Sequence, residues 1–118
     1  MKTLYVEVMS SGEALKRIAR AWKGTSSGKV VDATIGLGSI AELTALLSPK
    51  RMELLRHVAQ SSGLSIRSLA QALGRDYKNV HTDVVDLEAR HLLERDDTGL
   101  VTAPYDELVI RATLRQAA

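Results

Sequence analysis

The chain has 118 residues, of which 45% are hydrophobic and only 3% aromatic, and it contains neither cysteine nor phenylalanine. This length suits one domain, or one small domain with an extension, and its core must be built from aliphatic side chains. The lack of cysteine excludes disulfides and thiolate metal sites, and the formal net charge of +2 excludes a strongly basic protein. Any affinity for nucleic acid must therefore come from a local surface and must weaken as salt rises.

The first 47 residues are predicted to form an extension with the order strand, helix, strand, helix. Residues 2–8 alternate as a strand does, with Leu4, Val6 and Val8 on one face and Tyr5 and Glu7 on the other. Residues 29–35 alternate in the same way. We expect these strands to form a small two-stranded sheet with a helix on one face. Because a chain of this size is marginal alone, we also expect residues 1–47 to contribute to a homodimer interface.

Two capping boxes mark the helices of this extension. Ser10 and Glu13 begin the first helix, which Gly24 ends. Ser39 and Glu42 repeat the pattern at the start of the second helix. The apolar face of that second helix is predicted to contain Ile40, Leu43, Leu46 and Leu47.

A domain of residues 48–103 is predicted to follow, and it begins with two helices. Ser48 is a good N-cap for the first, and Pro49 stands at the first helical position, where a missing amide is tolerated. The side chains expected to face inward are Met52, Leu55, Val58 and Ala59. The second helix, residues 65–73, begins at Ser65 and ends at Gly74 in a left-handed position. Its apolar face contains Ile66, Leu69, Ala70 and Leu73.

A third helix is predicted over residues 76–91, with Asp76 as its N-cap. A buried stripe is formed by Val80, Val84 and Leu87, at helical spacing. The opposite side then presents Lys78, Thr82, Val85 and Ala89, flanked by Asn79, His81 and Asp86. This mixture of donors, acceptors and small apolar groups is of the kind that reads base edges in a major groove.

A β-hairpin is predicted directly after this helix. Leu92 and Leu93 lead into its first strand, Asp97-Thr98-Gly99 has the residue types of a tight turn, and residues 100–102 form the returning strand. Arg95 is the one basic residue of the hairpin, and the acidic Asp96 and Asp97 beside it are unfavourable near phosphate. Three helices followed by a hairpin predict a winged helix-turn-helix, so the expected fold class is α+β.

Residues 104–118 are predicted to form a C-terminal strand or tail. Alternation from Leu108 to Arg115 favours a strand, whereas Asp106 and Glu107 also suit the first turn of a helix from Tyr105. Such a strand could pair with residues 2–8, either within one chain or across a dimer.

Several stretches together resemble a family of small prokaryotic predicted transcriptional regulators, whose winged helix-turn-helix is similar to that of MarR-type repressors. These stretches are Leu47-Ser-Pro-Lys-Arg-Met-Glu-Leu-Leu-Arg56, Leu64-Ser-Ile-Arg-Ser-Leu-Ala70, Leu73-Gly-Arg-Asp-Tyr-Lys-Asn-Val80, Asp86-Leu-Glu88 and Pro104-Tyr-Asp-Glu107. The resemblance implies sequence-specific binding to double-stranded DNA, often as a dimer, and autoregulation of a small operon. Some members resemble antitoxins, so an antitoxin-type protein that neutralises a partner toxin is the alternative.

We therefore expect an autoregulating repressor whose helix 76–91 enters the major groove, located in the cytoplasm at the nucleoid. Side chains of helix 65–73 and Arg75 are assigned mainly to phosphates, and the resemblance carries recognition positions onto residues 77–79, 81 and 82. The full expected DNA-binding set is Ser65, Arg67, Ser68, Arg75, Tyr77, Lys78, Asn79, His81, Thr82 and Arg95. A winged helix that binds only protein, as an adaptor, is a further alternative.

No enzyme, cofactor or metal chemistry is expected from the sequence. No motif positions a nucleophile beside a base, and the three histidines (His57, His81 and His91) lack ligand spacing. The Gly36-Leu-Gly38 run lacks the further glycine and the Lys-Ser/Thr pair of a phosphate loop. No apolar run is long enough to predict a membrane span.

Overall fold

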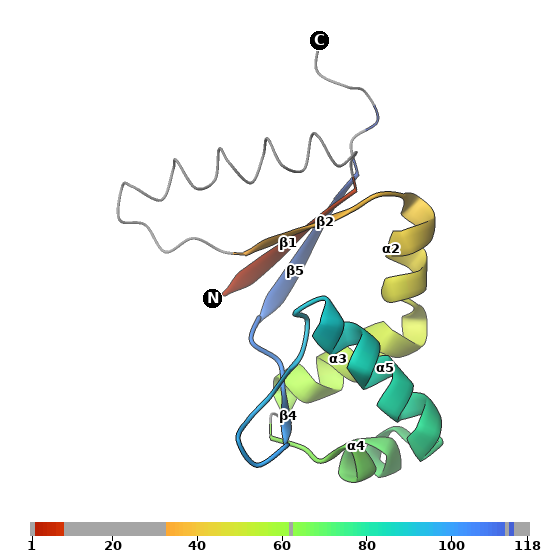
Figure 1. Ribbon diagram of the computed structural model, residues 1–118, viewed down its shortest axis with the longest axis vertical. Coiled ribbons are helices and arrows are strands. Elements are labelled where there is room, and N and C mark those ends of the chain that lie inside the picture. Colours follow the sequence, from red (N-terminus) through yellow and green to blue (C-terminus); the bar gives the residue numbers. More distant parts are fainter. Residues whose placement is uncertain (1, 9–32, 62, 113, 115–118) are drawn as a thin grey trace. The chain divides into compact units, whose positions relative to one another are not determined.

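The computed structural model describes residues 2–8, 33–61, 63–112 and 114, and the chain divides into two compact units. Unit 1 contains Met1–Ala45 and Glu107–Ala118, and unit 2 contains Leu46–Asp106. Within the described residues there are four helices and two small sheets (Figure 1), so the fold class is α+β, as expected. The predicted helix of residues 10–24 and the first part of the predicted strand 29–35 lie outside the described residues.

Unit 1 is built on a three-stranded parallel sheet. Its strands are β1 (Thr3–Val8), β2 (Thr34–Leu37) and β5 (Glu107–Ala112), in the order β2-β1-β5. Val6 of the central strand pairs with Ile35 on one side and with Ile110 on the other. The C-terminal segment forms the favoured strand rather than a helix and joins β1 within the same chain, so the two-stranded sheet expected for residues 1–47 is extended to three strands.

The central strand buries side chains on both faces. Leu4 and Val6 are fully buried, as the alternation predicted. Glu7 was placed on the opposite face, yet it is only 6% exposed. Its carboxylate accepts a hydrogen bond from Nη1 of Arg111 on β5 at 3.4 Å. Because β1 has a neighbouring strand on each side, side chains of those strands also cover its polar residues. The alternation of apolar and polar residues is therefore not enough to predict which side chains of β1 are exposed.

The short helix α2 (Ile40–Leu46) begins with the predicted capping box. The hydroxyl of Ser39 accepts from the amide of Glu42 at 3.1 Å, and the Glu42 carboxylate accepts from the amide of Gly38 at 2.8 Å. Of its predicted apolar face, Leu46 is buried and Ile40 is exposed. Seven residues make only about two turns. Ile40 stands in the first turn, and its side chain is exposed to solvent there.

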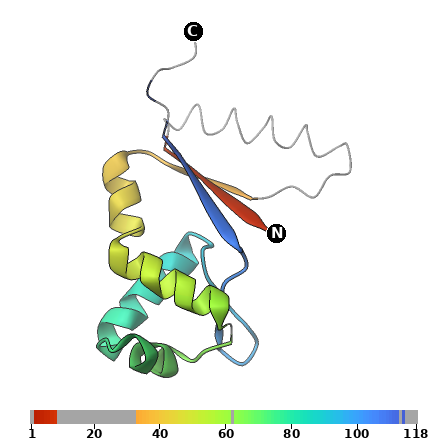
Figure 2. The same cartoon turned by 180° about the vertical axis from the view of Figure 1, so that it is seen from behind.

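Unit 2 begins with α3 (Pro49–Gln60), whose N-cap Ser48 accepts from the amide of Arg51 at 3.3 Å, as predicted. The buried side chains of this helix are Leu54, Leu55 and Val58. Leu55 and Val58 are thus buried as predicted, whereas Met52 is partly exposed, Ala59 is exposed, and the buried Leu54 was not included in the prediction. In Figure 2, which shows the fold from behind, α3 (yellow-green) lies in front of α5 (teal).

The next two helices, α4 (Ile66–Leu73) and α5 (Tyr77–Ala89), have the predicted caps. Ser65 accepts from the amide of Ser68, and Gly74 ends α4 with a φ of 63°. Asp76 accepts from the amides of Lys78 and Asn79 at 3.1 and 3.4 Å. The predicted stripe of α5 is fully buried, and it contains Val80, Val84 and Leu87.

The end of α5 comes earlier than residue 91. Arg90 caps the helix, and His91 has a φ of 65°, a left-handed conformation that cannot continue a right-handed helix. The chain then turns back through two buried residues, Leu92 and Leu93, into the hairpin.

The hairpin consists of β3 (Glu94–Arg95) and β4 (Val101–Thr102), paired antiparallel. Val101 is fully buried and also bridges to Leu64, the residue before the α4 cap, through an N–H···O bond of 2.7 Å. One backbone position thus ties the hairpin to the segment between α3 and α4. Gly99 supplies the positive φ, 85°, at the hairpin turn.

Candidate functional site

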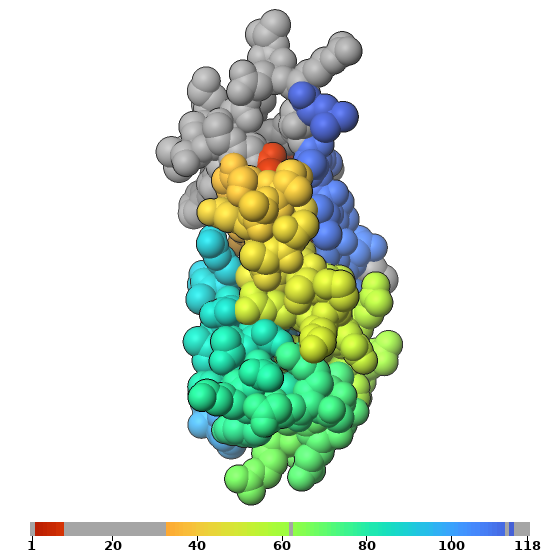
Figure 3. Space-filling model, turned by 90° about the vertical axis from the view of Figure 1, so that its right-hand side faces the viewer, coloured from red at the N-terminus to blue at the C-terminus, as the bar shows by residue number. Residues whose placement is uncertain are grey.

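The candidate site is the exposed face of α4 and α5. All predicted DNA-contact residues except Arg95 lie within residues 65–82, on α4, on the turn after it or on the first half of α5. Figure 3 shows the green and teal surfaces of α4 and α5 side by side on unit 2. The sequence prediction therefore selected neighbouring residues.

The outward face of α5 is polar but mixed. Because Val80, Val84 and Leu87 are buried, the residues on the opposite side point to solvent. The exposed members of the predicted set on α5 are Tyr77, Lys78, Asn79, His81 and Thr82, and Val85 is exposed beside them. The rings of Tyr77 and His81 lie 6.0 Å apart and are tilted by 38°.

Three of these polar groups differ in their freedom to bind. The hydroxyl of Thr82 donates to the backbone oxygen of Lys78 at 3.1 Å, which leaves its oxygen lone pairs and its methyl group for other contacts. The side chains of Lys78 and Asn79 form no hydrogen bond or ion pair with any other described residue. Their N–H groups are therefore available to donate to a ligand.

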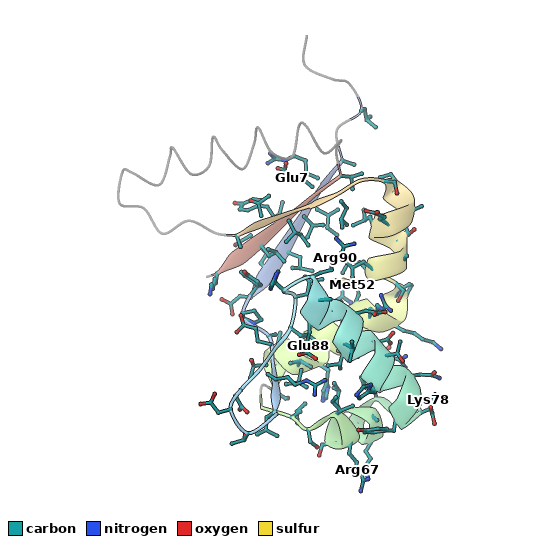
Figure 4. The ribbon with its side chains drawn as sticks, viewed as in Figure 1. Glu7, Met52, Arg67, Lys78, Glu88 and Arg90 are labelled. Carbon is teal, nitrogen blue, oxygen red and sulfur yellow. The ribbon has the colours of Figure 1, made fainter. Side chains whose placement is uncertain are left out.

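Arg67 extends the site onto α4. Figure 4 shows its side chain projecting outward from α4, and Lys78 at the outer side of the first turn of α5. Ser68 is exposed beside it, and its hydroxyl accepts a 3.0 Å hydrogen bond from Ser65. The two helices also border a shallow hollow, lined by Arg67, Ala70, Gln71, Gly74, Arg75 and Tyr77.

Arg75 is held inward rather than offered to a phosphate. Its Nη2 lies 2.7 Å from Oδ2 of Asp83, and the two side chains are only 17% and 14% exposed. Its Nη1 is buried and has no hydrogen-bond partner among the described residues. The expectation of an available phosphate contact therefore does not match the position of this guanidinium, because a carboxylate on α5 has captured it.

Arg95 is likewise engaged within the protein. Its Nε lies 2.8 Å from Oε1 of Glu88 on α5, and both side chains are partly buried. Figure 4 places Glu88 on α5. The one basic side chain of the hairpin is thus paired with α5, and the acidic Asp96 and Asp97 remain beside it.

Asp83 is the centre of an ion network that sequence reasoning missed. One of its oxygens lies 3.0 Å from Nε of Arg51 on α3, and the other binds Arg75. Arg51 also pairs with Asp86 through its Nη2. Burial alone would lower the pKa of Arg51, but its hydrogen bonds and charge interactions with the two aspartates outweigh burial, so the pKa is raised.

The network has two effects on the face. It joins α3, the α4–α5 turn and α5 at one point, which fixes the position of α5. It also neutralises the carboxylate of Asp86, which otherwise places a negative charge on the outward side of α5. A sequence signal for Asp83 existed, because it stands three positions after Val80 and four before Leu87, at the edge of the buried stripe, where an aspartate needs a partner.

Other classes of site are not found within residues 2–8, 33–61, 63–112 and 114. No three His, Asp or Glu side chains there gather as metal ligands do. In that same part of the chain, no helix has the length and apolar character needed to span a bilayer.

Comparison with known proteins places the chain in a family. No curated protein matches it. Residues 46–110 match the HVO_A0114 family, and this segment covers α3, α4, α5, the hairpin and most of β5. Since the match spans 65 of the 118 residues, more than half of the chain, the chain belongs to the HVO_A0114 family.

Proposed function

We propose that the chain is a sequence-specific regulator that binds double-stranded DNA, and that unit 2 is a winged helix-turn-helix similar to that of MarR-type repressors. In this proposal, α5 enters the major groove, α4 crosses the phosphate backbone, and the β3–β4 hairpin is the wing. The regulator acts as an autoregulating repressor in the cytoplasm, and it is not an enzyme.

The observation that carries the proposal is the exposed face of α5. Lys78 and Asn79 lie on its first turn and their side chains are engaged with no other described residue, with Thr82 about one turn and Val85 about two turns further along. An amine that donates to guanine, an amide that pairs with adenine and small apolar groups that contact thymine form a set able to distinguish base pairs. The exposed face of an ordinary surface helix is more uniformly charged.

The order of elements in unit 2 also supports the proposal. A helix, a bridging residue at Leu64, two capped helices and a hairpin follow each other in the sequence. A winged helix-turn-helix requires this order. The hairpin, however, offers little positive charge, since Arg95 is paired with Glu88. Backbone binding must therefore rest mainly on α4, through Arg67 and the exposed Ser68 beside it.

The first experiment is a binding assay with a labelled duplex from the region upstream of the protein's own gene, beside a scrambled duplex of the same composition. We expect tighter binding to the native duplex, and weaker binding to both as salt rises from about 50 to 200 mM. Equal weak binding to the two duplexes, or none, would contradict the proposal. It would favour the protein-interaction alternatives, an antitoxin-type protein or an adaptor.

A further inference from the structure

The outer edge of β5 is a candidate interaction surface in unit 1. The strand order β2-β1-β5 places β5 at an edge, and no described strand pairs with its outer side. An edge strand carries unpaired backbone donors and acceptors that can add a further strand. Ile110 is a large apolar residue of this strand and is 48% exposed.

The side chains of β5 carry opposite charges near its two ends. Glu107 and Arg111 lie on the same face of the sheet because they are four residues apart in a strand. Their contacts confirm this face. Glu107 accepts from the hydroxyl of Thr3 at 3.3 Å, and Arg111 pairs with Glu7, both from the neighbouring β1. Val109 lies midway between the two charges, on the same face.

We propose that two copies of this chain pair through β5, antiparallel, about a two-fold axis that passes beside Val109. This register places each Glu107 opposite Arg111 of the partner subunit, and each Val109 opposite Val109 of the partner subunit. On the other face, Leu108 lies opposite Ile110 of the partner subunit. Two three-stranded sheets then become one continuous sheet of six strands.

Charge complementarity distinguishes this partner and this register. A two-fold axis perpendicular to a sheet keeps each face on the same side, so a residue can only lie opposite one of the same parity. A shift of the axis by one position, to Ile110, removes both ion pairs and sets Arg111 opposite Val109 of the partner subunit. A parallel arrangement places like charges together, which is unfavourable across strands.

Arg111 is able to serve two carboxylates. Its side chain is 54% exposed although it contacts Glu7, and a guanidinium has five N–H donors. The pairing therefore extends an existing interaction into a chain of contacts from Glu7 through Arg111 to Glu107 of the partner subunit. The opposite edge of the sheet, β2, has the sequence Thr-Ile-Gly-Leu and offers no comparable charge pair.

The test is the mass of the full chain in solution, measured without DNA by sedimentation equilibrium from about 1 to 100 µM, since a short strand edge alone makes a small interface. We expect a reversible dimer. Glu107→Lys sets a lysine opposite each partner arginine and leaves the Glu7–Arg111 pair intact, so we expect the dimer dissociation constant to rise roughly tenfold or more. Glu107→Gln is the control and should weaken the dimer less.

A second pair of variants guards against misfolding. The Arg111→Glu variant has acidic residues at both positions of its edge, and the Glu107→Lys variant has basic residues at both. Each variant alone should dimerise more weakly, but a mixture of the two should form a heterodimer, because every charge then faces an opposite charge. Ile110→Lys should weaken the dimer, whereas Ile40→Lys, at an equally exposed isoleucine of α2, should not. Circular dichroism checks that each variant is folded.

The proposed dimer contact lies in unit 1 and does not require DNA binding, so the two proposals can fail separately. A wild type that stays monomeric throughout this range overturns the dimer, even if it binds its duplex. A dimer that Glu107→Lys and Ile110→Lys leave unchanged also overturns it. A dimer that responds as expected stands even if no duplex is recognised.

Discussion

At the scale of single residues, the exposed face of α4 and α5 contains two side chains that differ in what they can contact. Asn79 has an amide whose oxygen and nitrogen can pair with one base edge, whereas Arg67 projects from α4, which is proposed to cross the backbone. Both side chains are exposed and neither is engaged with another described residue. Their removal should therefore change different properties of DNA binding and leave the fold intact.

Asn79→Ala should relax the preference at one base position. The lost amide contact corresponds to about 1 to 3 kcal/mol of discrimination. The measurement is a competition assay with duplexes that carry each of the four base pairs at every position of the site. A uniform loss of affinity across all duplexes, without a change in preference, would show that Asn79 does not read a base.

Arg67→Ala should weaken binding to every duplex alike and reduce the slope of log K against log salt by about 1. The matched control is Arg56→Ala, which removes an exposed arginine of α3 outside the candidate site. If both variants lower affinity equally, the effect of Arg67 is one of overall charge and the proposed position of α4 is wrong.

At the scale of elements, α5 is held by packing and by one shared carboxylate. Asp83 binds Arg51 of α3 and Arg75 of the α4–α5 turn, and all three side chains are largely buried. Removing the Asp83 carboxylate takes from Arg75 the carboxylate that it binds, and from Arg51 one of its two aspartates. The ion network therefore contributes to the stability of unit 2 as well as to the position of α5, the helix proposed to enter the major groove.

Asp83→Ala should lower the free energy of unfolding by about 2 to 3 kcal/mol, less than for a fully buried pair because solvent still reaches these side chains. Asp86→Ala is the control, because Asp86 is 49% exposed and bridges to Arg51 alone. It should change the stability by less than about 1 kcal/mol. Urea unfolding followed by circular dichroism measures both, and equal effects would mean that Asp83 has no special role.

The hairpin depends on another carboxylate, Asp96. Its Oδ1 accepts from the hydroxyl of Thr98 at 2.6 Å and from the amides of Thr98 and Leu100 at 2.9 and 3.0 Å. The hydrogen bond from the Thr98 hydroxyl, followed by the backbone ones, lowers the pKa of Asp96 below its ordinary 3.8. A lowered folded pKa means that this contribution is present above pH 3.8 and is lost as the pH falls through the folded value.

We therefore expect the amide resonances of Thr98 and Leu100 to titrate together below pH 3.8 in NMR spectra. Asp96→Asn keeps an acceptor oxygen but has no titrating group, so the shared transition should disappear. A transition in the wild type at or above the ordinary value would contradict the hydrogen bonding described for this turn.

At the scale of the whole molecule, the sequence predicted features that depend on nearby residues. The caps at Ser48, Ser65 and Asp76 and the stripe of Val80, Val84 and Leu87 are confirmed, because each involves positions within about two helical turns. The α+β class followed from these features together.

Features that depend on distant residues were missed. The Arg51–Asp83 pair joins positions 32 residues apart, and the contact of Arg111 with Glu7 spans 104. No local pattern specifies such pairings. The strand of the C-terminal segment was favoured for the same kind of local reason, but its pairing with residues 2–8 within one chain was left open. Arg75 and Arg95 were included in the DNA-contact set although carboxylates hold them, because Asp83 and Glu88 are only 8 and 7 residues away but lie on another element, and a local pattern does not say how elements pack. Which residues of the exposed face touch DNA stays a prediction.

The central position of β1 determines when the sheet can form during synthesis. Its partner β5 ends at Ala112, so synthesis must pass that residue before Leu4 and Val6 are covered on that side. Unit 2, in contrast, is one uninterrupted segment of residues 46–106. Helices and hairpins with local contacts also form faster than pairings between strands far apart in the sequence. Unit 2 should therefore form before β5 joins the sheet, while the β5 side of β1 remains an open apolar edge that chaperones can bind.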